Sequence, residues 1–329
     1  MQKINRELLI ETAEKLLQDG TVNRVLGWKK GDFSYDLTPA VFTSLEDLKE
    51  NFVFNDFSGA NFSKYLIKET KSNDGKVLVF LKPCDTYSFN QLLTEHRFDK
   101  EKVYAVGIAC DGMIDVKKIK ELVGDGILSV DCSENQIKVE TLYDGVKTFD
   151  KKDLLQERCV NCKSKKHVYY DMLLGDEGQI LDSNRFDEVE KLEKMSAEER
   201  YAFWQNELSR CIRCNACRDV CPACTCEKCV FDNPNSGVEN KSPANSFEEQ
   251  MFHIIRAFHV AGRCTDCGEC SRVCPQHIPL HLLNRKFIKD INSFYGDYQA
   301  GEEVGSRAPL TNYTKEDLEP SDAVAKGDK

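Results

Sequence analysis

The sequence predicts an α/β N-terminal domain with an open, mostly parallel sheet, followed by an α-helical, cysteine-rich domain. Two apolar runs, KVLVFLKPCD at 76–85 and KVYAVGIACD at 102–111, each precede a helical pattern. Buried parallel strands form continuous apolar runs and need helical connections between them. Eleven of the sixteen cysteines lie between Cys211 and Cys274, whereas the first 158 residues contain three. This uneven distribution indicates the second domain.

The composition narrows the class of protein. The chain has 329 residues with 55 acidic and 45 basic side chains, which give a formal net charge of −10. Its length indicates about two domains, and its negative charge disfavours nucleic acid as a partner. No apolar stretch approaches the roughly 20 residues that span a bilayer, and the N-terminal residues do not resemble a secretory signal. We therefore expect a cytoplasmic protein without membrane insertion.

Helix signals indicate the remaining organisation. Apolar residues in 4–19 follow helical spacing, and the patterns at 187–210 and 247–260 are also helical. The first of these two patterns contains a capping-box pair, Ser196 and Glu199. The expected domains are an α/β domain at 1–185, a helical dicluster domain of ferredoxin type at 186–300 and an extended tail at 301–329.

The strongest functional signal is a pair of cysteine runs. Each has the form C-x2-C-x2-C-x3-C-P, at 211–222 and 264–275. In this pattern the first three thiolates bind one iron–sulfur cube, and the chain carries the fourth to the other cluster. Structural zinc is the alternative, although its sites usually combine separated cysteine pairs. We assign one 4Fe-4S cluster to Cys211, Cys214, Cys217 and Cys274, and a second to Cys264, Cys267, Cys270 and Cys221.

Four further cysteines predict a third cluster. Cys84 and Cys110 lie just beyond the carboxyl ends of the two expected strands, at the edge where α/β sheets bind ligands. Cys159 and Cys162 form a C-x2-C pair that can close over this edge. Four thiols would then converge, as a 4Fe-4S cluster requires. Alternatively, Cys84 and Cys110 are small buried hydrophobes.

The remaining cysteines leave two interpretations open. Cys224, Cys226 and Cys229 exceed the requirement of two clusters. They are either ligands of an additional, fourth metal centre or buried thiols packed beside the clusters. Cys132 has no partner in its segment and is expected to be incidental. Five arginines among the cysteines either offset cluster charge or lie on the surface, namely Arg210, Arg213, Arg218, Arg263 and Arg272.

Catalytic and dinucleotide motifs are absent from the sequence. It contains neither GxGxxG nor GxxxxGK[ST], and no nucleophile and base pair stands out. His253 and His259 share one expected helix and are predicted to be packing or surface residues. No catalytic residue is assigned.

Five segments resemble the beta-subunit family of deazaflavin-dependent (coenzyme F-420) hydrogenases and formate dehydrogenases. The resemblance is to the branch with a C-terminal two-cluster ferredoxin domain. CPACTC is also similar to beta subunits of archaeal sulfhydrogenase and to an iron–sulfur subunit of anaerobic sulfite reductase. The segments are LKPCDTYS, VGIACDGMID, RCVNCKSKKHVYYDMLLGDEG, LSRCIRCNACRDVCPACTCEKC and AGRCTDCGECSRVCPQHIPLHLLNRK.

The resemblance implies an electron-transfer subunit of a multisubunit anaerobic oxidoreductase. Such a subunit relays single electrons between a catalytic dehydrogenase or hydrogenase subunit and a flavin, heterodisulfide-reductase-like or ferredoxin partner. Some relatives bind FAD and reduce the deazaflavin directly, so the alternative is an FAD-containing beta subunit that exchanges hydride with a deazaflavin or nicotinamide. No flavin motif of this sequence matches residue by residue. A zinc-bound scaffold without redox activity is the third class.

Overall fold

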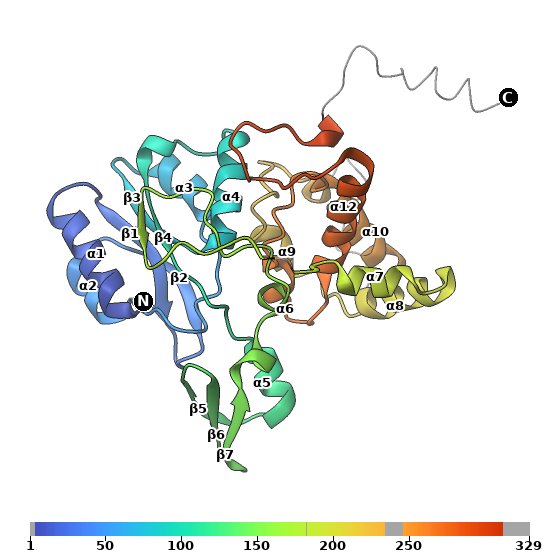
Figure 1. Ribbon diagram of the computed structural model, residues 1–329, viewed down its shortest axis with the longest axis horizontal. Helices are drawn as coiled ribbons and strands as arrows, with labels where there is room; N and C mark the ends of the chain where they lie inside the picture. The colour runs from blue at the N-terminus through green and yellow to red at the C-terminus, as the bar shows by residue number, and fades with distance from the viewer. Residues whose placement is uncertain (1–3, 182, 234–245, 312–329) are drawn as a thin grey trace.

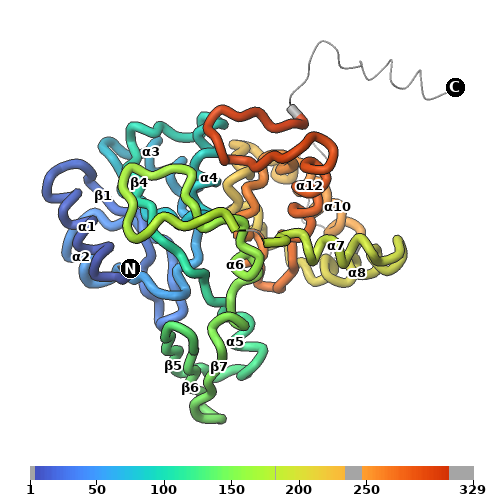
Figure 2. Tube along the Cα trace, in the orientation of Figure 1, coloured from blue at the N-terminus to red at the C-terminus, as the bar shows by residue number. Residues whose placement is uncertain are grey.

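The computed structural model describes residues 4–181, 183–233 and 246–311. An α/β body at the N-terminal end lies beside a helical, cysteine-rich body, and a small sheet projects from the first (Figure 1). In the tube view, α6 (Glu157–Val160) lies between the projecting sheet and the helical body, and the chain then returns to the α/β body before it enters the helical body (Figure 2).

A mixed sheet forms the centre of the α/β body. Its strand order is β2-β1-β3-β4-β8, in which β2 is antiparallel to β1 and the other neighbours are parallel. The predicted open, mostly parallel sheet is therefore confirmed. The strands are β1 (Arg24–Lys30), β2 (Leu37–Phe42), β3 (Val77–Leu81), β4 (Val103–Ile108) and β8 (Met172–Leu174), and the helices packed with them are α1 (Arg6–Gln18), α2 (Leu45–Asn51), α3 (Tyr65–Ser72) and α4 (Pro83–Thr94).

The main hydrophobic core lies between this sheet and its helices. All five residues of β3 are buried, as the continuous apolar run predicts. Aromatic side chains fill the centre: the Phe52 ring lies 5.8 Å from Phe80 and 6.5 Å from Trp28 between centroids. Because all three are fully buried, they contribute a large share of the apolar burial that stabilises the sheet.

The helix after the second apolar run does not cover the main sheet. It was expected to be a connection between parallel strands, but α5 (Val116–Val123) packs against a separate antiparallel sheet. In this sheet, β6 alternates strictly between exposed and buried residues, so one face is apolar and needs a covering helix. The three strands are β5 (Ile127–Cys132), β6 (Gln136–Thr141) and β7 (Gly145–Asp150).

The helical body is built from short helices around the cysteine runs. The predicted helix at 187–210 divides into two, because Ser196 accepts a hydrogen bond from the Glu199 N–H and starts a new helix. The helices are α7 (Asp187–Glu193), α8 (Ala197–Ser209), α9 (Ala216–Asp219), α10 (Ser246–His259), α11 (Glu269–Arg272) and α12 (Leu280–Tyr295). Short 3-10 turns are η1 (Lys100–Lys102), η2 (Lys151–Leu154), η3 (Val230–Asp232) and η4 (Pro309–Thr311). No described helix is long and apolar enough to cross a membrane.

The start of the predicted tail packs on α4. Gly301 has a φ of +76°, and an added Cβ would lie 1.8 Å from the carbonyl oxygen of Tyr87, so only glycine fits this contact. The Gly305 N–H donates to Thr94 Oγ1 at 2.9 Å. The expected extended arm therefore begins as a segment held against the α/β body, and residues 312–329 lie outside the described residues.

Buried charges join the two bodies. Glu269 on α11 is completely buried and pairs with Arg158 of the α/β body at 2.7 Å. Lys117 donates to the carbonyls of Ser271 and Cys274 at 3.0 and 2.8 Å, and Lys64 donates to the carbonyl of Arg218 at 3.0 Å. Side chains of the first body thus satisfy carbonyl groups of the cysteine-rich turns.

We expect Phe52→Ala to lower the free energy of unfolding by about 3–5 kcal/mol, because it leaves a cavity between buried rings. Urea unfolding followed by tryptophan fluorescence measures the change. Phe294→Ala is the control, since this ring is 77% exposed, and it should change the free energy by no more than about 0.5 kcal/mol. Equal losses in both variants would contradict the central position of Phe52.

Candidate metal centre

The two cysteine runs adopt the same backbone turns. In each run the second residue after the first cysteine is left-handed: Arg213 has φ 53° and Asp266 has φ 56°. The residue after the second cysteine is also left-handed, with φ 62° at Asn215 and 66° at Gly268. A short helix follows in both, α9 and α11. These turns wrap each chain segment tightly, so the two runs form a pair of equivalent thiol cradles.

The first cradle collects three cysteines of one run and the last of the other. One small cavity is lined by Cys211, Cys214, Cys217 and Cys274. Cys214 is exposed, whereas Cys217 and Cys274 are buried. The cavity thus contains the complete set that the spacing predicts for one cluster, which we call site I.

The second cradle is deeper. Cys221 packs against Cys264, and it also interacts electrostatically with Cys267 and Cys270. Burial raises the pKa of Cys264 and Cys270 to about 12. We call this set site II.

The donor chemistry of both sites fits iron–sulfur clusters. Buried thiols stay protonated unless a cation stabilises the thiolate, and metal ions do so directly. Backbone N–H groups also point at sulfur atoms, since Arg213 N lies 3.4 Å from Cys211 Sγ. Such hydrogen bonds are among the features that set cluster potentials. When bound, the clusters would supply one-electron redox chemistry, and the thiols of sites I and II would hold them.

The four remaining predicted ligands line a third cavity. It contains Cys84, Cys110, Cys159 and Cys162. Cys84 lies in the first turn of α4 and Cys110 just after β4, so the parallel strands β3 and β4 bring them to the same sheet edge. Cys159 and Cys162 come from α6 and the residues after it. The third cluster stays a prediction, and its four ligands form what we call site III.

Cationic side chains surround site III. Lys165 donates to the Cys110 carbonyl at 2.8 Å, and Lys163 lies 4.0 Å from the centroid of the Tyr87 ring. Arg158 is buried and interacts electrostatically with Cys84 and Cys159. The Met113 N–H donates to Cys159 Sγ at 3.4 Å. Positive charge and N–H donors favour a group with anionic sulfur ligands.

The three extra cysteines do not share one environment. The thiol of Cys224 is hydrogen-bonded to Cys221, and this bond lowers the pKa of Cys221. Cys226 is exposed and Cys229 is half-buried. Cys224 therefore lies beside a site II cysteine, as one of the two interpretations expects, while the roles of Cys226 and Cys229 stay undecided predictions.

The arginines among the cysteines pair mainly with carboxylates. Arg263 binds Glu95 at 2.6 Å and Arg272 binds Glu269 at 2.7 Å. Arg210, Arg213 and Arg218 likewise have acidic partners, namely Glu207, Glu249 and Asp232.

Sequence reasoning missed three polar residues on the buried face of α10. Arg256, which lies outside both cysteine runs, donates to the Cys217 carbonyl at 3.1 Å. His253 Nε2 lies 3.3 Å from Cys211 Sγ, and Glu249 also faces this sulfur. Within the described residues, Cys211, Glu249 and His253 are the only three metal-donor groups whose atoms lie within 4.8 Å of one another. The i, i+4 spacing of Glu249 and His253 on one helix was the available sequence signal.

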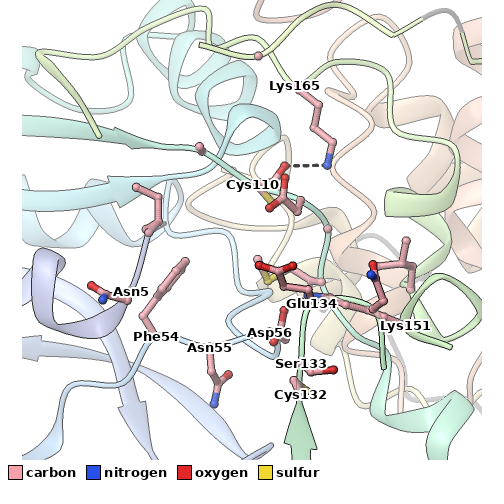
Figure 3. A pocket seen from close by; sticks show the side chains of 18 of the residues that line it. Asn5, Phe54, Asn55, Asp56, Cys110, Cys132, Ser133, Glu134, Lys151 and Lys165 are labelled. Carbon is pink, nitrogen blue, oxygen red and sulfur yellow. Dashed lines mark hydrogen bonds and ion pairs between the residues drawn. The ribbon is translucent and has the colours of Figure 1, made fainter. Parts of the chain in front are cut away.

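A large pocket of about 1220 Å³ opens beside site III. Its lining includes Cys110 and Lys165 on one side and Asp56, Cys132 and Lys151 on the other (Figure 3). Its walls come from the residues that follow β4 and from the ends of β5 and β7 in the small antiparallel sheet, among others. Cys132 is thus a half-buried pocket residue, and burial raises its pKa to about 12.

Comparison with known proteins agrees with this geometry. The family of 4Fe-4S dicluster domains matches residues 207–278. Residues 207–278 are a 4Fe-4S dicluster domain. This domain contains sites I and II, and the match confirms that the chain is an iron–sulfur protein.

Curated relatives extend the similarity over most of the chain. F420-dependent formate dehydrogenase subunit beta of Methanocaldococcus jannaschii is 25% identical, covering 83% of this chain and 86% of the relative. The subunit beta of F420-dependent formate dehydrogenase 1 of Methanococcus maripaludis is 25% identical, covering 89% of this chain and 92% of the relative. The chain's homologues are thus beta subunits of F420-dependent formate dehydrogenase, and the predicted resemblance is confirmed. A chain of the solved F420-reducing [NiFe] hydrogenase complex from Methanosarcina barkeri aligns at 15% identity with a TM-score of 0.38. The alignment covers 62% of this chain and 86% of that chain.

We expect Cys159→Ala to lower the iron content by about four atoms per chain, because it removes one ligand of one cube. Anaerobic iron and sulfide analysis measures the loss. Cys132→Ala is the control and should keep the full iron content. Unchanged iron in Cys159→Ala would refute a cluster at site III.

We also expect Cys274→Ala and Cys214→Ala to remove the same paramagnetic signal, although the two residues belong to different runs. Both would serve the cluster of site I. Electron paramagnetic resonance of the dithionite-reduced variants makes the comparison. If the spectrum of Cys274→Ala instead matched that of Cys267→Ala, the predicted exchange of the fourth ligand between the two runs would be wrong.

Proposed function

We propose that this chain is the iron–sulfur electron-transfer subunit of a cytoplasmic, multisubunit anaerobic oxidoreductase related to F420-dependent formate dehydrogenase. It relays single electrons between a catalytic dehydrogenase or hydrogenase subunit and a flavin, heterodisulfide-reductase-like or ferredoxin partner. The dicluster domain and the curated relatives support this role. All sixteen cysteines are free, which suits a reducing compartment.

The observation that carries the proposal is the contact between successive cysteine sets. Arg158 interacts with Cys84 and Cys159 of site III and donates to the Cys267 carbonyl of site II at 2.6 Å. Lys163 of the C-x2-C segment donates to the Thr265 carbonyl. Residues beside site III therefore donate hydrogen bonds to backbone carbonyls of the site II run, across the boundary of the two bodies.

Site I completes the series. Arg256 donates to the Cys217 carbonyl of site I at 3.1 Å, and its charge interacts electrostatically with Cys221 and Cys270 of site II. Cys214 then brings site I to the protein surface. Clusters in sites III, II and I would form a continuous path from the interior sheet edge to solvent, which is the arrangement that a relay of single electrons requires.

A second candidate function has its own support. The large pocket shares Cys110 and Lys165 with site III, so a flavin bound there would lie next to the proposed third cluster. In this alternative the chain carries FAD and itself exchanges hydride with a deazaflavin or nicotinamide. FAD when bound would convert hydride transfer into single-electron steps, and the residues around the pocket would hold it.

Flavin analysis of the anaerobically purified chain separates the two functions. The relay predicts no stoichiometric flavin and no hydride exchange by the chain itself. One FAD per chain, together with turnover of a deazaflavin or NAD(P)H, would replace the relay with the flavoenzyme. The measurement is made on the chain alone and on its complex with co-purifying subunits.

Within that complex, Cys159→Ala should interrupt the relay. We expect the catalytic partner to reduce a viologen dye as before, while electron transfer to the physiological acceptor falls at least about tenfold, because the path lacks the cluster of site III. Stopped-flow absorbance measures both rates. Undiminished transfer to the physiological acceptor would exclude site III from the path.

A further inference from the structure

Helix α10 buries four polar residues and leaves four apolar residues exposed, although Phe252 and Ala257 are also buried. Phe247, Met251, Ile254 and Phe258 recur at helical spacing and are 38–68% exposed. Glu249, Gln250, His253 and Arg256 are each at most 8% exposed. A helix on the surface of a protein normally has the opposite pattern. Since burial of polar groups costs free energy, the inward polar residues need specific partners, and the first cysteine run supplies partners for His253 and Arg256.

His253 faces one sulfur atom of site I. Its Nε2 lies 3.3 Å from Cys211 Sγ, and its Nδ1 has no hydrogen-bond partner among the described residues. A thiolate bound to iron has no proton and can only accept. With a cluster in place, His253 Nε2–H is therefore the donor. A carboxylate oxygen of Glu249 lies within 4.8 Å of the same sulfur and 3.7 Å from Arg213.

Asn284 on α12 approaches a sulfur atom of site II, that of the third cysteine in its run. Its Nδ2 lies 3.6 Å from Cys270 Sγ, within reach of a hydrogen bond to sulfur, and the side chain is 5% exposed. Each dicluster site thus receives one side-chain N–H from a long helix: His253 for site I and Asn284 for site II.

Arg256 is shared by the two sites. It is 4% exposed, and its guanidinium interacts with cysteines of both sites. Its Nη2 donates a hydrogen bond to the Cys217 carbonyl at 3.1 Å, while its Nε has no hydrogen-bond partner among the described residues. A buried cation in this position stabilises added negative charge on either neighbour.

We propose that His253, Asn284 and Arg256 are positioning residues that set the reduction potentials of the two dicluster centres, the first two individually and Arg256 jointly. Reduction adds one negative charge to a cluster, so N–H donors and a nearby cation stabilise the reduced form more than the oxidised form. This inference rests on the proposed function, because it requires clusters in sites I and II.

Three matched variants test the assignment: His253→Leu, Asn284→Leu and Arg256→Gln. Potentials are measured by redox titration followed by paramagnetic resonance, on the anaerobically purified protein. His253→Leu should make one-electron reduction at site I roughly tenfold less favourable, which equals a shift of about 59 mV to lower potential, and leave site II unchanged. Asn284→Leu should lower the potential of site II and leave that of site I unchanged, and Arg256→Gln should lower both potentials.

Two controls separate these effects from general damage. His253→Gln keeps an N–H donor and should restore the potential of site I. Arg200→Gln removes a cation whose hydrogen bonds go to carbonyls of Leu192, Glu193 and Met195, and it should shift neither potential. Unchanged potentials in His253→Leu, with full iron content, would overturn the assignment.

Some variants could lose a cluster, and a measurement on the native protein covers that case. With ¹⁵N-labelled histidine, the reduced site I cluster should show a nitrogen coupling and an exchangeable proton that D₂O removes. Absence of this coupling would overturn the role of His253. If His253→Leu loses iron and the native protein shows a ¹⁵N coupling as strong as that of a nitrogen bound to iron, His253 is a ligand, and its role as a hydrogen-bond donor is overturned. A wild-type protein without iron would instead refute the proposed function.

Discussion

The structure depends on the cost of burying sulfur atoms that must carry negative charge. Most of the cysteines are wholly or partly buried, and burial raises the pKa of thiols such as Cys84, Cys264 and Cys270. Thiolates are therefore favourable in these positions only beside compensating charge. Metal ions supply the largest share of that charge, and buried lysine and arginine side chains supply more.

This requirement also explains how the two bodies are joined. Their contact is rich in ions: Arg158, Lys163 and Lys117 extend from the α/β body to carbonyl groups of the cysteine-rich turns. Glu269 balances Arg158 and Arg272 in the same region. A fully apolar contact would bring the cysteine sets equally close, but it would leave their turns without donors and their charge without compensation. The polar interface therefore serves the proposed path for electrons as well as the fold.

The outer face of α10 gives the dicluster domain a second unusual feature. His253 and Arg256 of this helix face the cysteine runs, whereas four of its apolar residues are left on the surface. The need for N–H donors near the sulfur atoms therefore affects both faces of α10, because polar residues on the buried face leave apolar residues on the exposed face.

Local patterns were enough for much of the fold and for the main cysteine sets. The apolar run before Cys84 predicted β3, the Ser196 and Glu199 pair predicted the start of α8, and the spacing from Cys211 to Cys274 predicted the dicluster domain. The exchange of Cys221 and Cys274 follows from the same spacing, and the cavity lined by Cys274 and three cysteines of the other run agrees with it. Each inference rests on residues close together in the chain, where local geometry decides the outcome.

Other features depend on residues far apart in the sequence. Only the folded chain brings Cys110 beside Cys159, pairs Arg158 with Glu269, and turns α5 away from the main sheet toward β5, β6 and β7. The sequence by itself determined the cysteine spacing that predicts iron ligands and most segments that form strands and helices, since ligand spacing and apolar periodicity are local. The tertiary structure decided which cations, histidines and amides face the sulfur atoms, because charge compensation acts through space and leaves no fixed spacing along the chain.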